Sequence, residues 1–448
     1  MTARCSIIIR SRNEERWIGL CLKEVFSQEY PNFEVILVDN ASDDKTLEKA
    51  KVFGLATVLS IESYRAGIAL NLGIEAATGE YIVCLSAHCI PANNYWLGNL
   101  VSALEEDSTC AGVYGRQEPM SFSSKADKRD LSVVFGLDRK VQRKDNFFHN
   151  ANSIIRRSCW NEVPFDSEIS NIEDRMWAQQ MLARGYFLLY EPSASVFHYH
   201  GIHQDGDEER LKNVVNIIET QDKTYRVGRV SPDSMTIAAI IPVRGESVEI
   251  GGRPLLAHTI EAALASEYID KVIVSTDNEF NVSVATEMGA DCPITRPKEL
   301  SEAHVNLDMV QQYTLEELEG KGYIPDLVVH LEETFPFRPN GLIDQMLLEL
   351  LEQGYDTVIA GKREKGFLWQ QAPDLSFKQL DSGDVPGQFK EKTYIGLHGL
   401  CCITYPQFIR AGSLVGNNIG IHEVDYPLSA IEVSRSHAEV FSRIPIIK

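Results

Sequence analysis

Two stretches of the sequence decide the predicted fold: Cys5-Ser-Ile-Ile-Ile-Arg10 near the start of the chain and Ile237-Ala-Ala-Ile-Ile-Pro242 near its middle. Each is a short run rich in isoleucine, and each opens directly into a polar loop, residues 11–15 after the first and residues 243–246 after the second. Short apolar runs bounded by polar loops are typical of buried strands in parallel sheets. The two openings therefore predict two halves of similar architecture.

Strand and helix patterns alternate after each opening run. In the first half, the apolar pattern predicts a helix over residues 17–26, a strand over 33–38, a helix near 46–53 and a strand over 81–85. In the second half, it predicts a helix over residues 254–265, strands over 271–275 and 326–331, and a helix near 342–351. This alternation predicts the α/β class, with a mainly parallel central sheet in each half.

The length of 448 residues indicates more than one domain, because domains usually hold about 100–200 residues. An acidic cluster, a predicted helix over residues 211–218 and the stretch 226–232 separate the two halves. We place the boundary near Val230. The predicted domains are residues 1–230, which end in a linker helix, and residues 231–448.

Composition excludes several classes of protein. Lys and Arg number 43 against 64 Asp and Glu, and the resulting net charge of −21 repels phosphate backbones, so we expect no nucleic-acid partner. The longest apolar runs fall short of the roughly 20 residues that cross a bilayer, and the first residues lack a secretion signal, so we expect a cytoplasmic protein. The nine cysteines are odd in number and contain no C-x-x-C pair, which indicates reduced thiols.

The residues just after the predicted strands are the first candidates for a ligand site, because ligands of open parallel sheets bind beyond the carboxyl ends of the strands. In the first half these positions are polar: residues 10–15, residues 39–44, Ser86-Ala-His88 and, further along, Glu173-Asp174 and His198-Tyr-His200. Neither half contains a G-x-G-x-x-G or Walker-type loop, which argues against NAD enzymes and P-loop ATPases.

Four motifs of the first half occur in a characteristic order: Ser6-Ile-Ile-Ile-Arg-Ser-Arg-Asn-Glu14, Glu34-Val-Ile-Leu-Val-Asp39-Asn-Ala-Ser-Asp43, Gly79-Glu80-Tyr-Ile and Glu173-Asp174. With them, residues 5–201 resemble the family 2 inverting glycosyltransferases of the GT-A fold. The resemblance implies a nucleotide-sugar donor whose base and ribose are held by Arg12, Asn13, Glu14 and Asp39. It also implies that Arg65 contacts the nucleotide, where a cation beside a diphosphate is favourable; alternatively, Arg65 is a surface arginine.

Asp174 is the predicted catalytic residue. Inverting transfer needs a carboxylate that takes the proton of the acceptor hydroxyl while that oxygen attacks the anomeric carbon opposite the leaving nucleotide. Glu173 is the second candidate for this role. Alternatively, the two carboxylates are a solvated pair at the N-terminus of a helix over residues 175–182, where negative charge is favourable.

The first half departs from the family at Ser86-Ala87-His88, where Asp-x-Asp usually holds a divalent cation against the donor diphosphate. A branch of the family carries Ser-x-His here and His-x-His after the last strand. We therefore assign Ser86 and His88 to donor binding. We also expect His88, with His198 or His200, to bind Mn²⁺ or Mg²⁺. Imidazole suits Mn²⁺ better than Mg²⁺. Alternatively, His88 donates directly to a phosphate without metal, and the other two histidines are partly buried strand residues.

Two further segments, Tyr114-Gly-Arg-Gln-Glu-Pro119 and Phe148-His-Asn-Ala-Asn152-Ser153, resemble the acceptor side of the same branch. The resemblance implies contacts of Arg116, Gln117, His149 and Asn152 with the acceptor or the donor sugar. The expected acceptor is a glycan or a lipid-linked glycan in the assembly of a surface polysaccharide.

The second half resembles the acylneuraminate (CMP-sugar) cytidylyltransferases. The motifs are Ile240-Ile-Pro-Val-Arg244-Gly245, Gly252-Arg-Pro-Leu-Leu-Ala-His-Thr-Ile260, Val274-Ser-Thr-Asp277, Arg296-Pro-Lys-Glu-Leu300 and Pro336-Phe-Arg338. The resemblance implies a second nucleotide-binding domain, with CTP or another cytidine nucleotide at Arg244, Gly245, Ser247, Ser275, Asp277, Arg296, Arg338 and Glu432. Alternatively, Arg296 and Arg338 form structural ion pairs.

Three departures weaken the case for synthesis in this half. The glycine-rich loop after Gly245 is short and has no lysine, the family's Gln-Pro-Thr-Ser-Pro-Leu-Arg reads Glu332-Glu-Thr-Phe-Pro-Phe-Arg338, and the late Asp-x-Asp metal pair reads Glu432-Val-Ser434. Three interpretations stay open: an altered cytidylyltransferase that supplies the donor, a nucleotide- or sugar-binding module, and a degenerate scaffold that dimerises. The sequence also leaves open whether the chain forms homo-oligomers.

Overall fold

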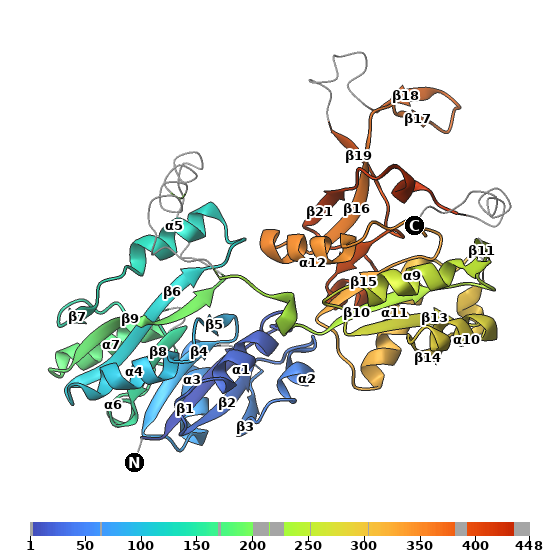
Figure 1. The fold of residues 1–448 in the computed structure, drawn as a ribbon. Helices are drawn as coiled ribbons and strands as arrows, with labels where there is room; N and C mark the ends of the chain where they lie inside the picture. The colour runs from blue at the N-terminus through green and yellow to red at the C-terminus, as the bar shows by residue number, and fades with distance from the viewer. Residues whose placement is uncertain are drawn as a thin grey trace. The chain divides into compact units, whose positions relative to one another are not determined.

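The structure is a computed structural model that describes residues 3–62, 65–168, 172–199, 215, 228–250, 252–302, 304–380 and 392–433. The chain divides into two compact units, residues 1–229 and 230–448, which are both drawn in Figure 1. Of the predicted linker helix over residues 211–218, the structure describes Val215, which is helical and buried. We predict that each unit folds independently of the other.

The first unit is built on one nine-stranded sheet. Its strand order is β3-β2-β1-β4-β8-β6-β9-β5, and β7 pairs with β9. The elements in chain order are β1 (Cys5–Ser11), α1 (Ile18–Phe26), β2 (Phe33–Asp39), α2 (Thr46–Ala50), β3 (Thr57–Ser60), α3 (Ala66–Ala76), β4 (Tyr81–Ser86), β5 (Cys89–Pro91), α4 (Trp96–Glu105), β6 (Cys110–Pro119), α5 (Lys125–Val134), β7 (Lys140–Gln142), β8 (Asn152–Arg156), α6 (Arg157–Glu162), α7 (Glu173–Ala183) and β9 (Phe187–His198).

Burial of β1 on both faces explains why its apolar run is uninterrupted. Ile7 and Ile9 belong to the core cluster that contains α1 and α4, whereas Ile8 belongs to the cluster on the opposite face with α3 and α7. Successive side chains of a strand alternate between faces, so a strand covered on both sides is apolar throughout. A Cβ at Gly73 would lie 2.5 Å from Ile8 Cγ2, and glycine there lets α3 pack closely on the sheet.

The second unit has an eight-stranded sheet of order β14-β13-β10-β15-β20-β16-β19, with β21 paired to β16. Helices α9 and α12 pack on one face of β10 and α11 packs on the other. The elements are the 3₁₀ turn η1 (Pro232–Ser234), β10 (Ile237–Pro242), β11 (Glu249–Ile250), β12 (Arg253–Pro254), α9 (Leu255–Leu264), β13 (Lys271–Thr276), α10 (Glu279–Glu287), β14 (Asp291–Thr295), η2 (Lys298–Ser301), α11 (Leu307–Gly320), β15 (Leu327–His330), α12 (Leu342–Gln353), β16 (Thr357–Glu364), β17 (Trp369–Gln371), β18 (Phe377–Gln379), β19 (Thr393–Gly396), β20 (Cys402–Thr404), α13 (Pro406–Arg410), β21 (Ile419–Glu423) and η3 (Pro427–Ala430).

The predicted α/β class is confirmed, and both sheets are mixed. The strands around β1 and around β10 are parallel, as predicted. Antiparallel strands extend each sheet on one side: β8 pairs antiparallel with β4 and β6, and β20 with β15 and β16. Each predicted helix and strand of the described residues is present, with ends that differ by a few residues.

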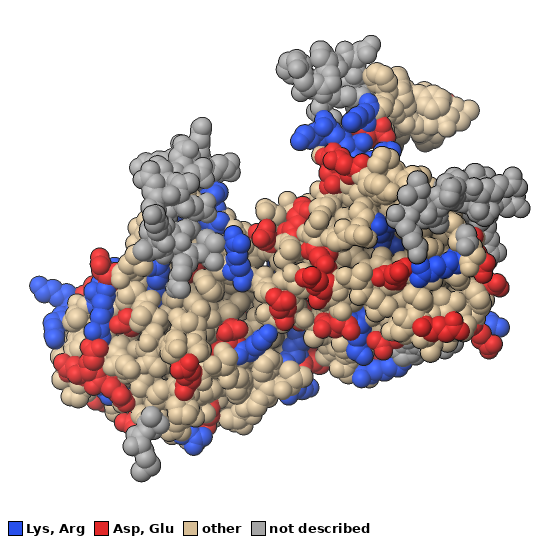
Figure 2. All heavy atoms as spheres, in the orientation of Figure 1, with Lys and Arg blue, Asp and Glu red and all other residues tan. Residues whose placement is uncertain are grey.

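The surface and cysteines agree with the composition. On the face shown in Figure 2, the described Lys and Arg side chains are interspersed with Asp and Glu and form no continuous basic surface. The eight cysteines with described side chains are all buried and free. Among the described helices, none combines the length and apolar character needed to span a membrane.

Candidate active sites

The first candidate site is a cavity of about 160 Å³ at the carboxyl ends of β1, β2 and β4. Parallel pairing places Ser11 beside Asp39 and Arg10 beside Ser86, so the loops after these strands open at one edge of the sheet. The cavity is lined by Arg10, Ser11, Arg12, Glu14, Asn40, Ser86 and His88. Arg12, Glu14, Ser86 and His88 were predicted to bind the donor, and the structure brings these four together.

Asn13 and Asp39 join the first two loops and are absent from the described cavity lining. Asp39 is fully buried. Its carboxylate accepts hydrogen bonds from the Ser11 hydroxyl at 2.8 Å and from the hydroxyl and amide of Ser42 at 2.6 and 2.9 Å. Asn13 has a left-handed backbone, with φ 53°, and its Oδ1 accepts from the amide of Asp43 at 3.0 Å. The contact of Asp39 with the donor stays a prediction; in the structure its carboxylate holds the loops after β1 and β2 together.

Two imidazole rings stack beside the cavity. The ring centroids of His88 and His198 are 5.2 Å apart, and the ring planes differ by 8°. Nδ1 of His88 lies 2.6 Å from Glu14 Oε1, and Nδ1 of His198 lies 2.6 Å from Gln117 Oε1. Cys89 adjoins them, and the three candidate ligand atoms of His88, Cys89 and His198 lie within 4.8 Å of one another. His200, the third predicted histidine, lies outside the described residues.

The carboxylates of Glu173 and Asp174 have different surroundings. Glu173 is buried, and its Oε1 lies 3.5 Å from Nη1 of Arg10, which also lines the cavity. Asp174 is half-buried at the first turn of α7, where Oδ2 accepts from the amide of Asn150 at 3.1 Å and Oδ1 from the amide of Arg175 at 2.8 Å. Burial raises the pKa of Asp174 above its usual range, although these two amides act in the opposite direction.

Three of the four residues predicted to meet the acceptor, Arg116, Gln117 and Asn152, are buried, and their contact with an acceptor stays a prediction. Arg116 and Gln117 lie on β6, whose ten residues are all buried between β8 and β9. Asn152 is fully buried: its amide donates to the carbonyls of Arg116 and Ala194 and accepts from the Trp96 indole. These contacts hold neighbouring strands together.

His149 alone of this predicted group is half-buried rather than fully buried. Burial and the nearby positive charge of Arg10 lower the pKa of His149 to about 4, so the ring is neutral at physiological pH. Its Nδ1 accepts from the amide of Ala151 at 3.3 Å. A neutral ring here adds no positive charge to the neighbourhood of Glu173.

Arg65 does not line the described cavity, and its contact with the nucleotide stays a prediction. Its Nη1 lies 2.6 Å from Glu168 Oε2 and donates to the Ser167 carbonyl at 3.3 Å. The guanidinium is thus paired on the surface with a carboxylate.

The second candidate site is a cavity of about 320 Å³ at the carboxyl ends of β10 and β15. It is lined by Pro242, Val243, Arg244, Arg296, Leu300, Glu302, Val305, Leu307, Val310, Glu332, Glu333 and Thr334. Arg244 and Arg296, two of the predicted nucleotide-binding residues, therefore face the same space. Arg244 is exposed, whereas Arg296 is buried.

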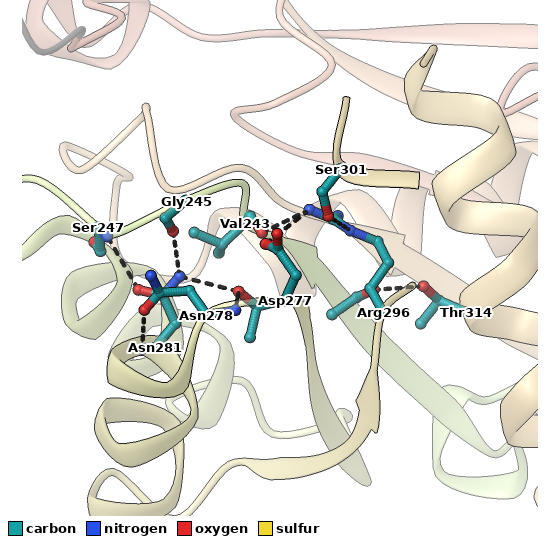
Figure 3. A network of polar contacts seen from close by, with 11 residues as sticks. Val243, Gly245, Ser247, Asp277, Asn278, Asn281, Arg296, Ser301 and Thr314 are labelled. Carbon is teal, nitrogen blue, oxygen red and sulfur yellow. Dashed lines mark hydrogen bonds and ion pairs between the residues drawn. The ribbon is translucent and has the colours of Figure 1, made fainter. Parts of the chain in front are cut away.

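The loop after β10 is held by a network centred on Asn281, a residue that was not predicted (Figure 3). The Asn281 side chain donates to the Gly245 carbonyl at 2.6 Å and accepts from the Ser247 amide at 3.0 Å. The Ser247 hydroxyl donates to the Glu333 carboxylate. The contact of Ser247 with the nucleotide stays a prediction; in the structure its amide donates to Asn281.

Asp277 and Ser275 lie around Arg296. The Arg296 guanidinium donates to the Val243 carbonyl and the Ser301 hydroxyl, each at 2.9 Å, and Asp277 Oδ1 lies 3.9 Å from Nη2, as Figure 3 shows. Burial lowers the pKa of Arg296, although Asp277 acts in the opposite direction. Ser275 is fully buried and its hydroxyl accepts from the Thr314 hydroxyl at 2.8 Å. Its carbonyl accepts from the amide of Val243 at 2.9 Å.

Arg338 is bonded inside the second unit, and its predicted contact with the nucleotide stays a prediction. Its guanidinium donates to the carbonyls of Leu400 at 2.6 Å, Gly399 at 2.7 Å and Glu332, and to the Thr259 hydroxyl at 2.8 Å. Arg338 is absent from the described lining of the second cavity. The alternative of a structural ion pair for Arg338 differs from what the structure shows, because these four hydrogen-bond partners are neutral groups.

Glu432 is exposed close to the second cavity. The next residue, Val433, donates its amide to the carbonyl of Thr334, which lines the cavity, at 2.7 Å. Ser434, the other half of the predicted motif, lies outside the described residues. The described structure thus offers one carboxylate at this point.

The sequence placed Arg10 among the polar residues at the ligand edge but assigned it no role, and it did not single out Asn150 or Asn281. Arg10 lines the first cavity and pairs with Glu173. Its Nη2 also donates to the Asn150 carbonyl at 3.4 Å, and the Asn150 amide donates to Asp174. A polar residue at the end of an apolar strand was the available signal for Arg10. No local pattern distinguished Asn150 or Asn281.

Two family models match the chain. The model described as glycosyl transferase family 2 matches residues 6–163, and the model described as cytidylyltransferase matches residues 238–378. The first match includes the predicted donor loops, and the second includes the Arg244 loop and Arg296.

Curated relatives match one half of the chain or the other. For the first half, a dolichyl N-acetyl-α-D-glucosaminyl phosphate 3-β-D-2,3-diacetamido-2,3-dideoxy-β-D-glucuronosyltransferase of Methanococcus voltae is 26% identical over 215 residues, 43% of this chain and 66% of the relative. Glycosyltransferase AglE of Haloferax volcanii is 27% identical over 237 residues, 50% of this chain and 75% of the relative. For the second half, a pseudaminic acid cytidylyltransferase of Campylobacter jejuni is 34% identical over 114 residues, 24% of this chain and 49% of the relative.

The order of the two matches agrees with the order of the two units, and each match contains one of the two cavities. Along the chain, a domain similar to the family 2 glycosyltransferases is therefore followed by a domain similar to the cytidylyltransferases.

Proposed function

We propose that the first domain is an inverting glycosyltransferase that moves a sugar from a nucleotide-sugar donor to a glycan or lipid-linked acceptor during assembly of a surface polysaccharide. The observation that carries the proposal is Arg10, which lines the donor cavity and also reaches Glu173 and the loop that binds Asp174. The cavity has two guanidinium groups, Arg10 and Arg12, and Arg10 connects it to the carboxylates of Glu173 and Asp174. The guanidinium groups suit a diphosphate, and a carboxylate suits proton removal.

In this mechanism Asp174 takes the proton of the acceptor hydroxyl. The acceptor oxygen forms its bond to the anomeric carbon as the bond to the nucleoside diphosphate breaks on the opposite face, and the leaving group departs with the electron pair. Arg10 and Arg12 stabilise the negative charge of that leaving group. Glu173 orients Arg10 through its buried ion pair.

A panel of UDP, GDP, dTDP, CDP and CMP sugars, offered to the purified chain with lipid-linked glycans, tests the proposal. We expect transfer from one nucleotide class, with a product whose new linkage has the opposite anomeric configuration to the donor by NMR. Retention of configuration would contradict the inverting assignment.

A divalent cation fits beside the donor cavity, with His88 and His198 as its ligands. Their Nδ1 atoms face Glu14 and Gln117, and contacts of this kind orient imidazoles that bind metals through the other nitrogen. The imidazole set favours Mn²⁺ over Mg²⁺. When bound, the cation would neutralise part of the diphosphate charge.

We therefore expect a chelator to abolish transfer and Mn²⁺ to restore it more fully than Mg²⁺. His88→Ala should lower the restored rate at least tenfold at subsaturating Mn²⁺, on the order of the loss seen when metal surroundings are altered. His304→Ala, at an exposed histidine of the second domain, is the matched control. Transfer that is indifferent to the chelator would contradict the metal site and favour direct donation from His88 to phosphate.

For the second domain we propose that Arg244 binds a cytidine nucleotide and that nucleotidyl transfer is slow. The exposed Arg244 supports binding. Two contacts favour slow attack at a phosphate. The Ser247 amide is bound to Asn281, and the Glu333 carboxylate lies beside it, so both reduce the stabilisation of developing negative charge. If the domain makes a CMP or CDP sugar, its fusion to the first domain raises the local donor concentration. The second candidate, a nucleotide-binding module without synthesis, is favoured by the same two contacts.

A further inference from the structure

The second cavity has more negative than positive charge in its described lining. Glu302, Glu332 and Glu333 contribute carboxylates, and Arg244 and Arg296 contribute guanidinium groups. Arg296 is buried and donates to the Val243 carbonyl and the Ser301 hydroxyl. Of the described lining, Arg244 is therefore the exposed cation, and a nucleotide phosphate is its natural partner.

The carboxylate of Glu332 is held in place from inside the domain. The fully buried His330 has Nε2 3.4 Å from Glu332 Oε1, and its Nδ1 lies 2.6 Å from Gln311 Nε2. The Glu332 amide donates to the Gly399 carbonyl at 2.7 Å. A Cβ on Gly399 would lie 2.7 Å from Glu332 Oε1, so glycine provides the room for the carboxylate.

Glu332 presents an ionised group to the cavity. Its side chain is 30% exposed. Burial alone would raise its pKa, but the hydrogen bond with His330 and the positive charge of Arg338 lower it overall. Glu333 adds a second carboxylate, bound to the Ser247 hydroxyl on the loop after β10. A ligand placed beside a bound nucleotide therefore faces two negative charges in a partly dehydrated space.

On the basis of the proposed cytidine nucleotide site, we infer that the second domain takes a co-substrate without a carboxylate, a neutral or amino sugar whose hydroxyl or ammonium group donates to Glu332. Such a group satisfies the carboxylate oxygens. A sugar carboxylate in the same place would meet like charges after the nucleotide phosphates have engaged Arg244. Like charges brought together at an interface disfavour binding strongly, so Glu332 acts as a specificity-determining residue.

The test uses the full chain saturated with CTP and two probes that differ in one charge, N-acetylneuraminic acid and its methyl ester. We expect the unmodified chain to bind the ester at least about tenfold more tightly than the acid, measured by calorimetry, because the ester lacks the repelled charge. Glu332→Gln should remove most of this preference, since glutamine keeps the shape and loses the charge.

Glu302→Gln is the matched control, because it removes one carboxylate from the lining at a side chain that is 60% exposed and screened by water. We expect it to change the preference less than about twofold. Equal or tighter binding of the acid by the unmodified chain, or a preference for the ester that persists in Glu332→Gln, would overturn the inference. A chain that fails to bind CTP in the first titration would instead contradict the proposed nucleotide site.

Discussion

Asp174→Asn is expected to lower the rate of sugar transfer by about 100- to 10,000-fold, the usual contribution of a general base. The amide keeps the shape of the carboxylate but cannot accept the proton of the acceptor hydroxyl. Donor affinity should survive, because Asp174 is absent from the described lining of the donor cavity. Single-turnover transfer and donor titration, measured on the same preparation, separate the two effects.

The pH profile gives a second readout for Asp174. A general base works in its deprotonated form, and burial raises the pKa of Asp174. Activity should therefore fall as the pH drops through this raised pKa, at a higher pH than for an exposed aspartate, and the fall should be missing from the residual rate of Asp174→Asn. Glu173→Gln is the control, and it should keep the acidic limb. Near-normal turnover in Asp174→Asn would show the assignment to be wrong, and loss of the limb in Glu173→Gln would transfer the role to Glu173.

Arg338→Met is expected to reduce the free energy of unfolding of the second unit by about 3–5 kcal/mol, because three carbonyls and one hydroxyl each lose a buried hydrogen bond from the guanidinium, at about 1 kcal/mol apiece. Burial already lowers the pKa of Arg338 to about 10, and its four partners hold the charge in place. Denaturant unfolding of the full chain, followed for the second unit, measures the change.

Arg253→Met is the matched control for this prediction. Arg253 pairs with Glu261 at 2.8 Å on the surface, where both side chains are more than 40% exposed, and such pairs contribute at most about 1 kcal/mol. If Arg338→Met instead left stability unchanged and weakened CTP binding, Arg338 would contact the nucleotide as the sequence resemblance implied.

The parallel core of each unit was predictable from sequence because the signal is local. A strand such as β1 is covered on both faces, so its apolar run is continuous, and the polar residues that follow it mark the ligand edge of the sheet. Arg12, Glu14, Ser86 and His88 were found in this way, and the structure places all four around one cavity.

The antiparallel strands were not predictable, because pairing between distant segments leaves no local pattern. On β6, the resemblance implied that Arg116 and Gln117 meet a ligand, and the structure shows that both side chains are buried. His198 reaches His88 because β5 pairs with β9 across more than one hundred residues of sequence. Motif resemblance suggested that pair, whereas composition and periodicity alone did not.

The fate of a polar side chain also depends on partners that sequence does not specify. Arg296 and Arg338 both occur in motifs implied to bind a nucleotide, but only Arg296 lines the cavity. The carbonyls that hold Arg338 belong to residues about 60 positions further along and to Glu332. Such backbone acceptors are present at every residue, so their convergence is visible only in the folded chain.

We propose that each half of the chain binds its own nucleotide, and ligand-dependent thermal unfolding of the full chain measures this. A ligand that binds only the folded state stabilises it by about 2.7 kcal/mol at a hundred times its dissociation constant. We predict that CTP raises the midpoint of the second unit, that one class of nucleotide sugar raises the midpoint of the first, and that Arg244→Ala removes only the CTP effect. A chain in which neither transition responds to any nucleotide, or in which Arg244→Ala leaves the CTP effect intact, would contradict the account.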